Sequence, residues 1–241
     1  NNSYMKIFLK SSIFFFDIID KFVHQKRIIK FFKKNKIKIQ NFIDVGSHKG
    51  LYTDLFIQNY KINKVLMFEP QIKIFNFLKK KYNKNKKIKI LNYAVSNKNN
   101  FQNLQLNHHD LTTTLSIFNK KNFYLKVKAL LFGVEKMTYQ KVRIKTVRLV
   151  DIFKKNKINH VDLLKVDTEG HELEVLEGLK KKINQIQFIL IEFHRDKIYL
   201  KYSPKKIHNH LLKNNFVLKA KFKFPFTSWE DRIYFNKNEN K

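Results

Sequence analysis

The chain has 241 residues and no cysteine. This absence excludes a disulfide framework, a thiolate zinc site, an iron–sulfur cluster and a cysteine nucleophile. Cytosine-C5 methylation and papain-like hydrolysis are therefore excluded, because both need a cysteine. A chain of this length buries a substantial core without cross-links, and a hydrophobic content of 43% fits a folded protein.

Arginine is also scarce. Only five of the 50 Lys and Arg residues are arginine, although the formal net charge is +31. A basic protein suggests a nucleic-acid or anionic membrane partner, but proteins that bind phosphates and bases usually favour the bidentate guanidinium of Arg. We attribute most of the charge to compositional drift towards Lys, Asn, Ile and Phe, and we do not expect a nucleic-acid partner.

Long hydrophobic runs are missing as well. The apolar cluster Ile13–Phe16 is followed by Asp17 and Asp20, so it is too short for a signal segment or a membrane span. We expect a cytoplasmic protein. Residues 11–34 place apolar side chains at helical spacing among many lysines, which favours a helix packed on the core. A basic helix in peripheral contact with a membrane surface is the alternative.

From residue 39 onward, short apolar runs alternate with segments of helical periodicity. Strands that are apolar throughout and alternate with helices are typical of a parallel sheet covered on both faces. We therefore predict an α/β fold with a doubly wound, Rossmann-like, mostly parallel sheet. The predicted strands are 39–45, 64–68, 88–95, 161–166 and 186–193, with 216–222 and 232–235 closing the sheet. The predicted helices are 52–60, 72–82, 173–183 and 204–213.

Residues 97–147 interrupt this rhythm. The stretches 101–106 and 141–147 alternate like exposed strands, so we expect an insertion after the third strand. A lid or substrate-shaping element explains it better than a second domain does. The predicted organisation is an N-terminal helical extension at 1–38, a main domain at 39–236 and a tail at 237–241.

Two of the five glycines, Gly46 and Gly50, follow the first predicted strand. Glycine there permits positive φ and a close approach of a ligand, which binds at the carboxyl ends of strands in such sheets. Their Gly-x-x-x-Gly spacing, with Asp44 two residues upstream, differs from the pyrophosphate-binding Gly-x-Gly-x-x-Gly. It favours a cofactor without phosphates. Glu69, followed by Pro70, ends the second strand, where an acid accepts hydrogen bonds from both ribose hydroxyls. Together these residues predict a pocket for S-adenosylmethionine.

Further titratable residues lie at the ends of the predicted strands 161–166 and 186–193. Asp167 ends the first of them, and we expect Glu169 and Glu172 in the first turn of the following helix. Acids in a first turn also cap a helix and complement its dipole, which is the structural alternative for these two. Glu192 and His194, two residues apart on a strand, point to the same face, and we expect them beside Asp167.

A metal bound by Asp167, Glu192 and His194 is compatible with this placement. Three residues of unknown geometry do not establish a metal site, however, so we assign no metal ligand and leave a divalent metal open. The structural alternative is a histidine at the edge of the core that is satisfied by the neighbouring glutamate.

In this order and spacing, the motifs resemble the FkbM family of S-adenosylmethionine-dependent methyltransferases. The resemblance covers residues 41–220, and its most specific block is LLKVDTEGHELEVLEGL at 163–179. The family usually has Gly-Ala-Asn where this chain has Gly46-Ser47-His48. The other matching pieces are IDVGSHKG at 43–50, FEP at 68–70, NYAVSN at 92–97, TVRLVD at 146–151 and IEFH at 191–194.

The resemblance implies a class I methyltransferase fold and O-methylation of a sugar, a glycan or another small hydroxylated acceptor. It also implies cofactor contacts for His48, at the position where the family's Asn bonds the methionine part, and for Asn92 and Ala94. A basic nucleic-acid- or membrane-surface-binding protein that keeps the fold without turnover is the alternative function. The sequence indicates no oligomeric state.

The cofactor determines what the protein must add. A sulfonium is already a good leaving group, so the protein mainly holds an acceptor oxygen in line with the methyl group. A hydroxyl is a poor nucleophile and needs a base. We expect His194 or Asp167 to be that base, with Glu192 orienting the imidazole and Glu169 as a lower-ranked alternative. For His194 we expect an ordinary pKa of about 6.5.

Overall fold

A computed structural model describes residues 23–107, 113–119, 122, 138–194, 197–224 and 229–240. The strands are β1 Asn41–Val45, β2 Lys64–Phe68, β3 Ile88–Leu91, β4 Ala94–Val95, β5 Phe101–Asn107, β6 Thr138–Val147, β7 Val161–Val166, β8 Ile186–His194, β9 Phe216–Lys223 and β10 Trp229–Asn236. The helices are α2 Gln25–Lys34, α3 Leu51–Asn59, α4 Ile72–Lys81, α6 Leu149–Lys155, α7 Glu172–Glu177 and α8 Pro204–Lys213, with 3-10 helices η3 Lys180–Gln185 and η4 Lys237–Asn240.

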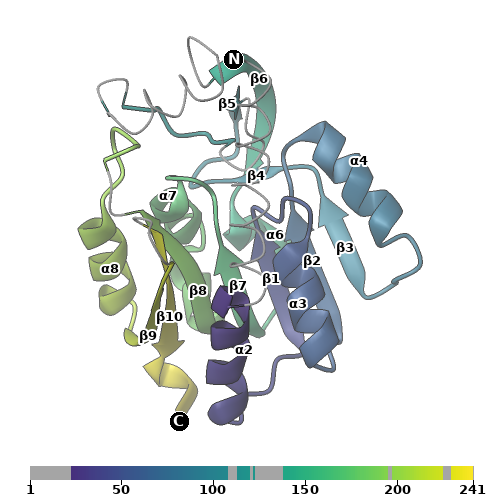
Figure 1. The fold of residues 1–241 in the computed structure, drawn as a ribbon, viewed down its shortest axis with the longest axis vertical. Helices are drawn as coiled ribbons and strands as arrows, with labels where there is room; N and C mark the ends of the chain where they lie inside the picture. Colours follow the sequence, from purple (N-terminus) through teal and green to yellow (C-terminus); the bar gives the residue numbers. More distant parts are fainter. Residues whose placement is uncertain are drawn as a thin grey trace, which may run out of the picture.

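Seven strands form the central sheet, in the order β3-β2-β1-β7-β8-β10-β9 (Figure 1). The five strands from β3 to β8 are parallel, whereas β10 runs antiparallel to both β8 and β9. The predicted doubly wound, mostly parallel α/β sheet is therefore confirmed. The carboxyl ends of β2, β1, β7 and β8 consequently lie next to one another at one edge of the sheet.

Both faces of the sheet are covered, which explains why its strands are apolar throughout. On one face, Phe42 of β1 and Met67 of β2 belong to a core that includes side chains of α2, α3 and α4. On the other, Val45 and Phe68 belong to a core with α6, α7, η3 and α8. Alternate residues of a strand point to opposite faces, so each strand supplies both layers.

The N-terminal helix α2 packs its apolar side on the core. Ile28 and Phe32 are fully buried, and the ring of Phe32 lies 5.6 Å from that of Phe188 in β8. The core-packing interpretation is thus confirmed for residues 25–34, whereas membrane contact through residues 11–22, outside the described part, stays a prediction. Among the described helices, none has the length and apolarity to span a membrane.

Two predicted elements are wrong in extent. The strand expected at 88–95 is divided into β3 and β4, which belong to different sheets. Asn92 lies between them, and its side-chain amide donates to the backbone carbonyls of Glu69 and Pro70, which turns the chain out of the central sheet. The helix expected at 173–183 ends at Glu177 and is followed by η3.

The insertion contains a small sheet in the order β4-β6-β5, in which β5 and β6 are antiparallel. The alternating patterns at 101–106 and 141–147 are therefore correctly predicted as strands. Thr114 adds a bridge to Gln105 of β5. This sheet lies above the carboxyl edge of the central sheet in Figure 1. The domain boundaries and the role as a lid stay predictions.

Candidate functional site

Predicted site residues from two motif groups meet at the carboxyl edge of the central sheet. Asp44 of β1 and Glu69 after β2 form one group, and Glu169 after β7, with Glu192 and His194 of β8, forms the other. Because β2, β1, β7 and β8 are neighbours, the two groups lie side by side along this edge. In an open α/β sheet, this edge is where ligands bind.

The Asp44 carboxylate is buried, and within the described structure only one of its two oxygens accepts a hydrogen bond. Its Oδ2 accepts a hydrogen bond of 2.7 Å from the hydroxyl of Thr53 in α3. Its Oδ1 has no hydrogen-bond partner within the described residues. Burial raises the pKa of Asp44, and Lys165 and Thr53 partly offset that rise. One acceptor oxygen is thus available beside the Gly46 turn.

The two glycines of this turn have positive φ, 78° at both Gly46 and Gly50, as their placement predicts. The space beside them, however, is filled by protein. A Cβ atom on Gly46 would lie 1.7 Å from the backbone oxygen of Asp167, and one on Gly50 would lie 2.4 Å from the hydroxyl of Tyr82. Both glycines thus permit close packing within the chain, and the close approach of a ligand to their backbone stays a prediction.

Glu69 is buried at the end of β2, and backbone amides hold its carboxylate. Oε2 accepts from the N–H of His48 at 2.9 Å, and Oε1 accepts from the N–H of Gln71 at 2.8 Å. Burial raises the pKa of Glu69 to about 7 against the lowering effect of these two hydrogen bonds. Asn92 braces the Glu69–Pro70 backbone, so its side-chain amide has a structural role.

Two further predicted cofactor residues, Pro70 and Ala94, lie near the turn after β2 and in β4, respectively. Ala94 is buried in β4 and pairs with Thr146 of β6. Pro70 follows Glu69 directly, two residues before α4. Cofactor contacts stay predictions for these two residues and also for Gly46, His48, Gly50 and Asn92.

A buried lysine that sequence reasoning missed lies between the two groups. Lys165 of β7 is 3% exposed, and its Nζ donates to Oδ2 of Asp167 at 2.8 Å. Burial disfavours its charge, but Asp167 and Asp44 outweigh that effect and raise the pKa of Lys165. The signal that could have identified Lys165 is its charge inside the apolar run 161–166, because a buried ammonium needs a carboxylate partner.

The same lysine connects to the N-terminal helix region. Its Nζ lies 4.2 Å from the ring centroid of Tyr52, whose hydroxyl donates to Asp231 at 2.6 Å. Nε2 of His24 lies 2.8 Å from the same Asp231 oxygen. Burial opposes ionisation of Asp231, yet these contacts hold its pKa below the usual range. The chain of contacts thus links α2, α3, β10 and β7 beneath the site.

The two glutamates that follow Asp167 have different surroundings. Helix α7 begins at Glu172, so Glu169 lies in the preceding turn, with φ of 56°, and its predicted place in the helix is wrong. Glu172 is fully buried and accepts from the backbone N–H groups of Thr168 and Gly170, both at 3.0 Å. Glu172 therefore closes the turn that precedes α7 rather than capping the helix.

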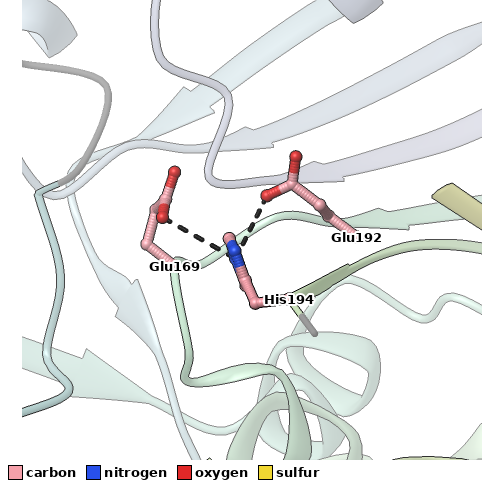
Figure 2. A group of neighbouring side chains, drawn as sticks. All are labelled: Glu169, Glu192 and His194. Atoms are coloured by element: carbon pink, nitrogen blue, oxygen red, sulfur yellow. Dashed lines mark ion pairs between the residues drawn. The ribbon is translucent and has the colours of Figure 1, made fainter. Parts of the chain in front are cut away.

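Glu192 and His194 lie side by side, as their spacing on one strand predicts, with 3.2 Å between Oε2 and Nε2 (Figure 2). Their third partner is Glu169, whose Oε2 lies 3.7 Å from the same nitrogen. Asp167 lies beside this group as expected, since its charge acts on Glu192 and Glu169, and its carboxylate also pairs with Lys165. Its role as a base stays a prediction. We call Glu169, Glu192 and His194 the carboxylate–histidine cluster.

Electrostatics within this cluster contradict the expected pKa of His194. Burial alone would lower it, but the carboxylates of Glu192 and Glu169 raise the pKa of His194 to about 10. Burial raises the pKa of Glu169 to about 7 and also raises that of Glu192. At neutral pH the chain alone thus holds a proton on the imidazole, so His194 in that state is not a free base.

Residues outside the predicted set hold the cluster in place. The hydroxyl of Tyr199 donates to Oε2 of Glu169, and the hydroxyl of Tyr202 accepts from the backbone N–H of His194 at 3.0 Å. From the insertion, Thr114 and Ser116 donate to the backbone carbonyls of Glu169 and Gly170. No sequence signal distinguishes Tyr199 or Tyr202 from the other tyrosines.

Comparison with known proteins identifies the family. Residues 44–218 match the methyltransferase FkbM domain. The chain belongs to this family. The hexuronic acid methyltransferase AglP of Haloferax volcanii is 35% identical over 51 residues, which make up 21% of each chain. The match thus spans about a fifth of that relative's length.

Solved structures show the same fold. The methyltransferase FkbM from Methylobacillus flagellatus KT is 16% identical with a TM-score of 0.53, over 82% of this chain and 43% of that one. The chain thus spans less than half of that protein. M. capricolum TrmK, solved with the cofactor product S-adenosyl-homocysteine, is 15% identical with a TM-score of 0.50, over 90% and 68%. The fold is that of class I methyltransferases.

Proposed function

We propose that this chain transfers a methyl group from S-adenosylmethionine to a hydroxyl oxygen of a sugar, a glycan or another small hydroxylated acceptor. The observation that carries the proposal is the arrangement along the carboxyl edge of the sheet. Asp44 and Glu69 lie at the ends of β1 and β2, and the carboxylate–histidine cluster lies at the ends of β7 and β8. We call the first group the cofactor end and the second group the acceptor end, and the two lie next to each other.

The residues at the cofactor end fit this group. S-adenosylmethionine carries a sulfonium, an ammonium and two ribose hydroxyls, which call for carboxylate acceptors. Asp44 Oδ1 is buried with no hydrogen-bond partner in the described structure, so it retains an acceptor for a cationic group. Glu69 is fixed by two backbone amides, and each of its oxygens has a second lone pair for a ribose hydroxyl.

When bound, the cofactor supplies a methyl group on a positively charged sulfur, a leaving group that needs no further activation. The task of the chain is then to hold the acceptor oxygen in line and to accept its proton. The carboxylate–histidine cluster is placed for this, since its two carboxylates are 17% and 20% exposed above the buried imidazole. The hydroxyl proton leaves through these carboxylates.

The acceptor class is supported by the relative and by the site. The name of the Haloferax volcanii relative describes methylation of a hexuronic acid. Polar side chains of the cluster, together with the hydroxyl-rich segment at Thr113–Ser116, suit a polyhydroxylated molecule. A hexuronic acid offers both hydroxyls and a carboxylate, and we propose a hydroxyl as the methylated group.

The test combines binding with product analysis. Calorimetry should show one S-adenosylmethionine site per chain, which Glu69→Gln weakens and the exposed control Glu177→Gln leaves unchanged. Labelled methyl groups should then pass to oligosaccharides that contain hexuronic acid. A base-stable methyl ether in the product supports O-methylation of a hydroxyl, whereas a base-labile methyl ester contradicts it. Absence of cofactor binding overturns the whole proposal.

A further inference from the structure

The carboxylate–histidine cluster has the composition of a metal site. Glu169 comes from the turn after β7, and Glu192 and His194 come from the end of β8, so three ligands of two types converge from two segments of the chain. One ligand atom from each residue lies within 4.8 Å of the other two. Figure 2 shows both carboxylates facing the imidazole from different sides.

The imidazole supplies a second observation. The side chain of His194 is 1% exposed, and within the described structure its Nδ1 has no hydrogen-bond partner, whereas its Nε2 contacts the cluster's own carboxylates, 3.2 Å from Glu192 and 3.7 Å from Glu169. Nearly all buried polar groups are hydrogen-bonded, so the open Nδ1 of this buried ring needs an explanation. Its Nε2 is aimed at the space between Glu169 and Glu192, which is where a bound ion would lie (Figure 2).

One of the ligand-to-ligand distances agrees with that between neighbouring ligands of one ion, and a second is somewhat longer. Metal–nitrogen and metal–oxygen bonds are about 2.1 Å long, so two ligands at angles of 90–109° are about 3.0–3.4 Å apart. Glu192 Oε2 lies 3.2 Å from His194 Nε2, within this range. Glu169 Oε2 lies 3.7 Å away, a difference that a small rotation of its side chain removes.

We propose that Glu169, Glu192 and His194 bind one divalent cation of the Mn²⁺ class and leave its other coordination positions open to the acceptor. Two carboxylates suit Mn²⁺, an imidazole suits first-row transition metals, and three protein ligands leave room for outer oxygens. This inference rests on the proposed function, because the open positions would orient the acceptor hydroxyl.

Surrounding contacts resemble those of established metal sites. Ligating carboxylates are usually fixed by hydrogen bonds from a second layer of residues. Tyr199 supplies one to Glu169, and Tyr202 holds the backbone of His194. Asp167, the ligand expected from the sequence, is instead paired with Lys165 and is not part of the proposed site.

The test uses Mn²⁺ as the probe and electron paramagnetic resonance as the readout. The full chain is stripped with EDTA, desalted and titrated with Mn²⁺, and we expect one ion to bind per chain. Glu192→Gln and His194→Gln should each weaken Mn²⁺ at least about 10-fold, since loss of a second-layer partner alone costs that much. The matched control is His160→Gln, which alters another histidine–carboxylate pair, at 2.9 Å from Asp162.

A melting experiment covers the case in which these variants fail to fold. Mn²⁺ should raise the melting temperature of the stripped wild-type chain in a concentration-dependent way. No Mn²⁺ binding to the wild type, or equal binding by folded Glu192→Gln, overturns the inference. Methyl transfer that continues in EDTA also overturns it but leaves the proposed function intact. Mn²⁺ binding without S-adenosylmethionine binding supports the metal site and contradicts the proposed function.

Discussion

The backbone oxygen of Asp167 occupies the space beside the Cα atom of Gly46, where a Cβ atom would lie 1.7 Å away. The N–H of Asp167 also donates to the carbonyl of Val45 at 3.0 Å. The turns after β1 and β7 are thus in direct backbone contact. These contacts directly join the two turns that border the proposed cofactor end and the proposed acceptor end.

Gly46→Ala should therefore destabilise the fold before it affects any ligand. The new Cβ atom collides with backbone, and alanine at φ of 78° is strained. We expect a loss of about 2–5 kcal/mol in the free energy of unfolding. Chemical denaturation without cofactor measures it, with Lys49→Ala in the same turn as the control. An unchanged unfolding midpoint would contradict the close contact.

Lys165→Met should be similarly severe, for an electrostatic reason. The substitution leaves Asp44, Asp167 and Asp231 without their shared cation in a buried place. Removing one partner of a buried ion pair costs about 3–5 kcal/mol. Lys64→Met, at the exposed start of β2, is the control and should change stability by less than about 0.5 kcal/mol. Equal melting curves for both variants would show that Lys165 contributes no charge compensation.

Cofactor affinity should depend on pH through Glu69, whose pKa is raised to about 7. The ionised carboxylate is the better acceptor for ribose hydroxyls, so affinity should rise from pH 6 to pH 8. Glu69→Gln should weaken S-adenosylmethionine by about 1.5–3 kcal/mol, the scale of a hydrogen bond to a charged group. Calorimetry at both pH values also tests this dependence of affinity on pH, which should disappear in Glu69→Gln.

Stability without cofactor should show the opposite dependence on Glu69. Its pKa in the folded chain is above the ordinary value of 4.5, so the folded state binds this proton more tightly than the unfolded state. The contribution of Glu69 to stability is complete below pH 4.5 and is lost as the pH rises through about 7. The melting temperature of Glu69→Gln relative to wild type should therefore be higher at pH 8 than at pH 5.

Turnover should depend on the carboxylate–histidine cluster while cofactor binding does not. Glu169→Gln and Glu192→Gln should each lower the methyl-transfer rate by roughly 10²–10⁴, the range for a lost proton acceptor. Their affinity for S-adenosylmethionine should match wild type in calorimetry. A parallel loss of affinity would place these residues in the cofactor pocket instead.

Most of the central sheet was predictable, because its strands are buried on both faces and so read as apolar runs. Val161–Val166 and Pro204–Lys213 have the predicted bounds. The break between β3 and β4 was not predictable, since it depends on the contact of the Asn92 amide with a loop about 20 residues away in sequence. Local periodicity contains no information about such contacts.

The composition of the candidate site was predicted, but not all of its contacts. Glu192 and His194 share a face because strand geometry fixes it. The approach of Glu169 to His194 and the pairing of Asp167 with Lys165 were not predicted, because both depend on how separate parts of the chain pack. The pKa of His194 departs from its ordinary value because two carboxylates lie close to a buried ring. Both the contacts of the cluster and the pKa of His194 depend on distances between side chains from different strands and turns.

The hydrogen bonds from Thr114 and Ser116 to the Glu169–Gly170 backbone have a consequence for protein engineering. Nearby, the backbones of Ile117 and Asn119 bond to Leu200 and Ile198. Three stretches of chain are therefore interlocked at the acceptor end: 113–119, 167–170 and 197–200. A chimera that takes only the first of these from a relative breaks the bonds to the other two. If this end binds the acceptor, a chimera designed to exchange acceptor preference needs all three stretches from the same relative.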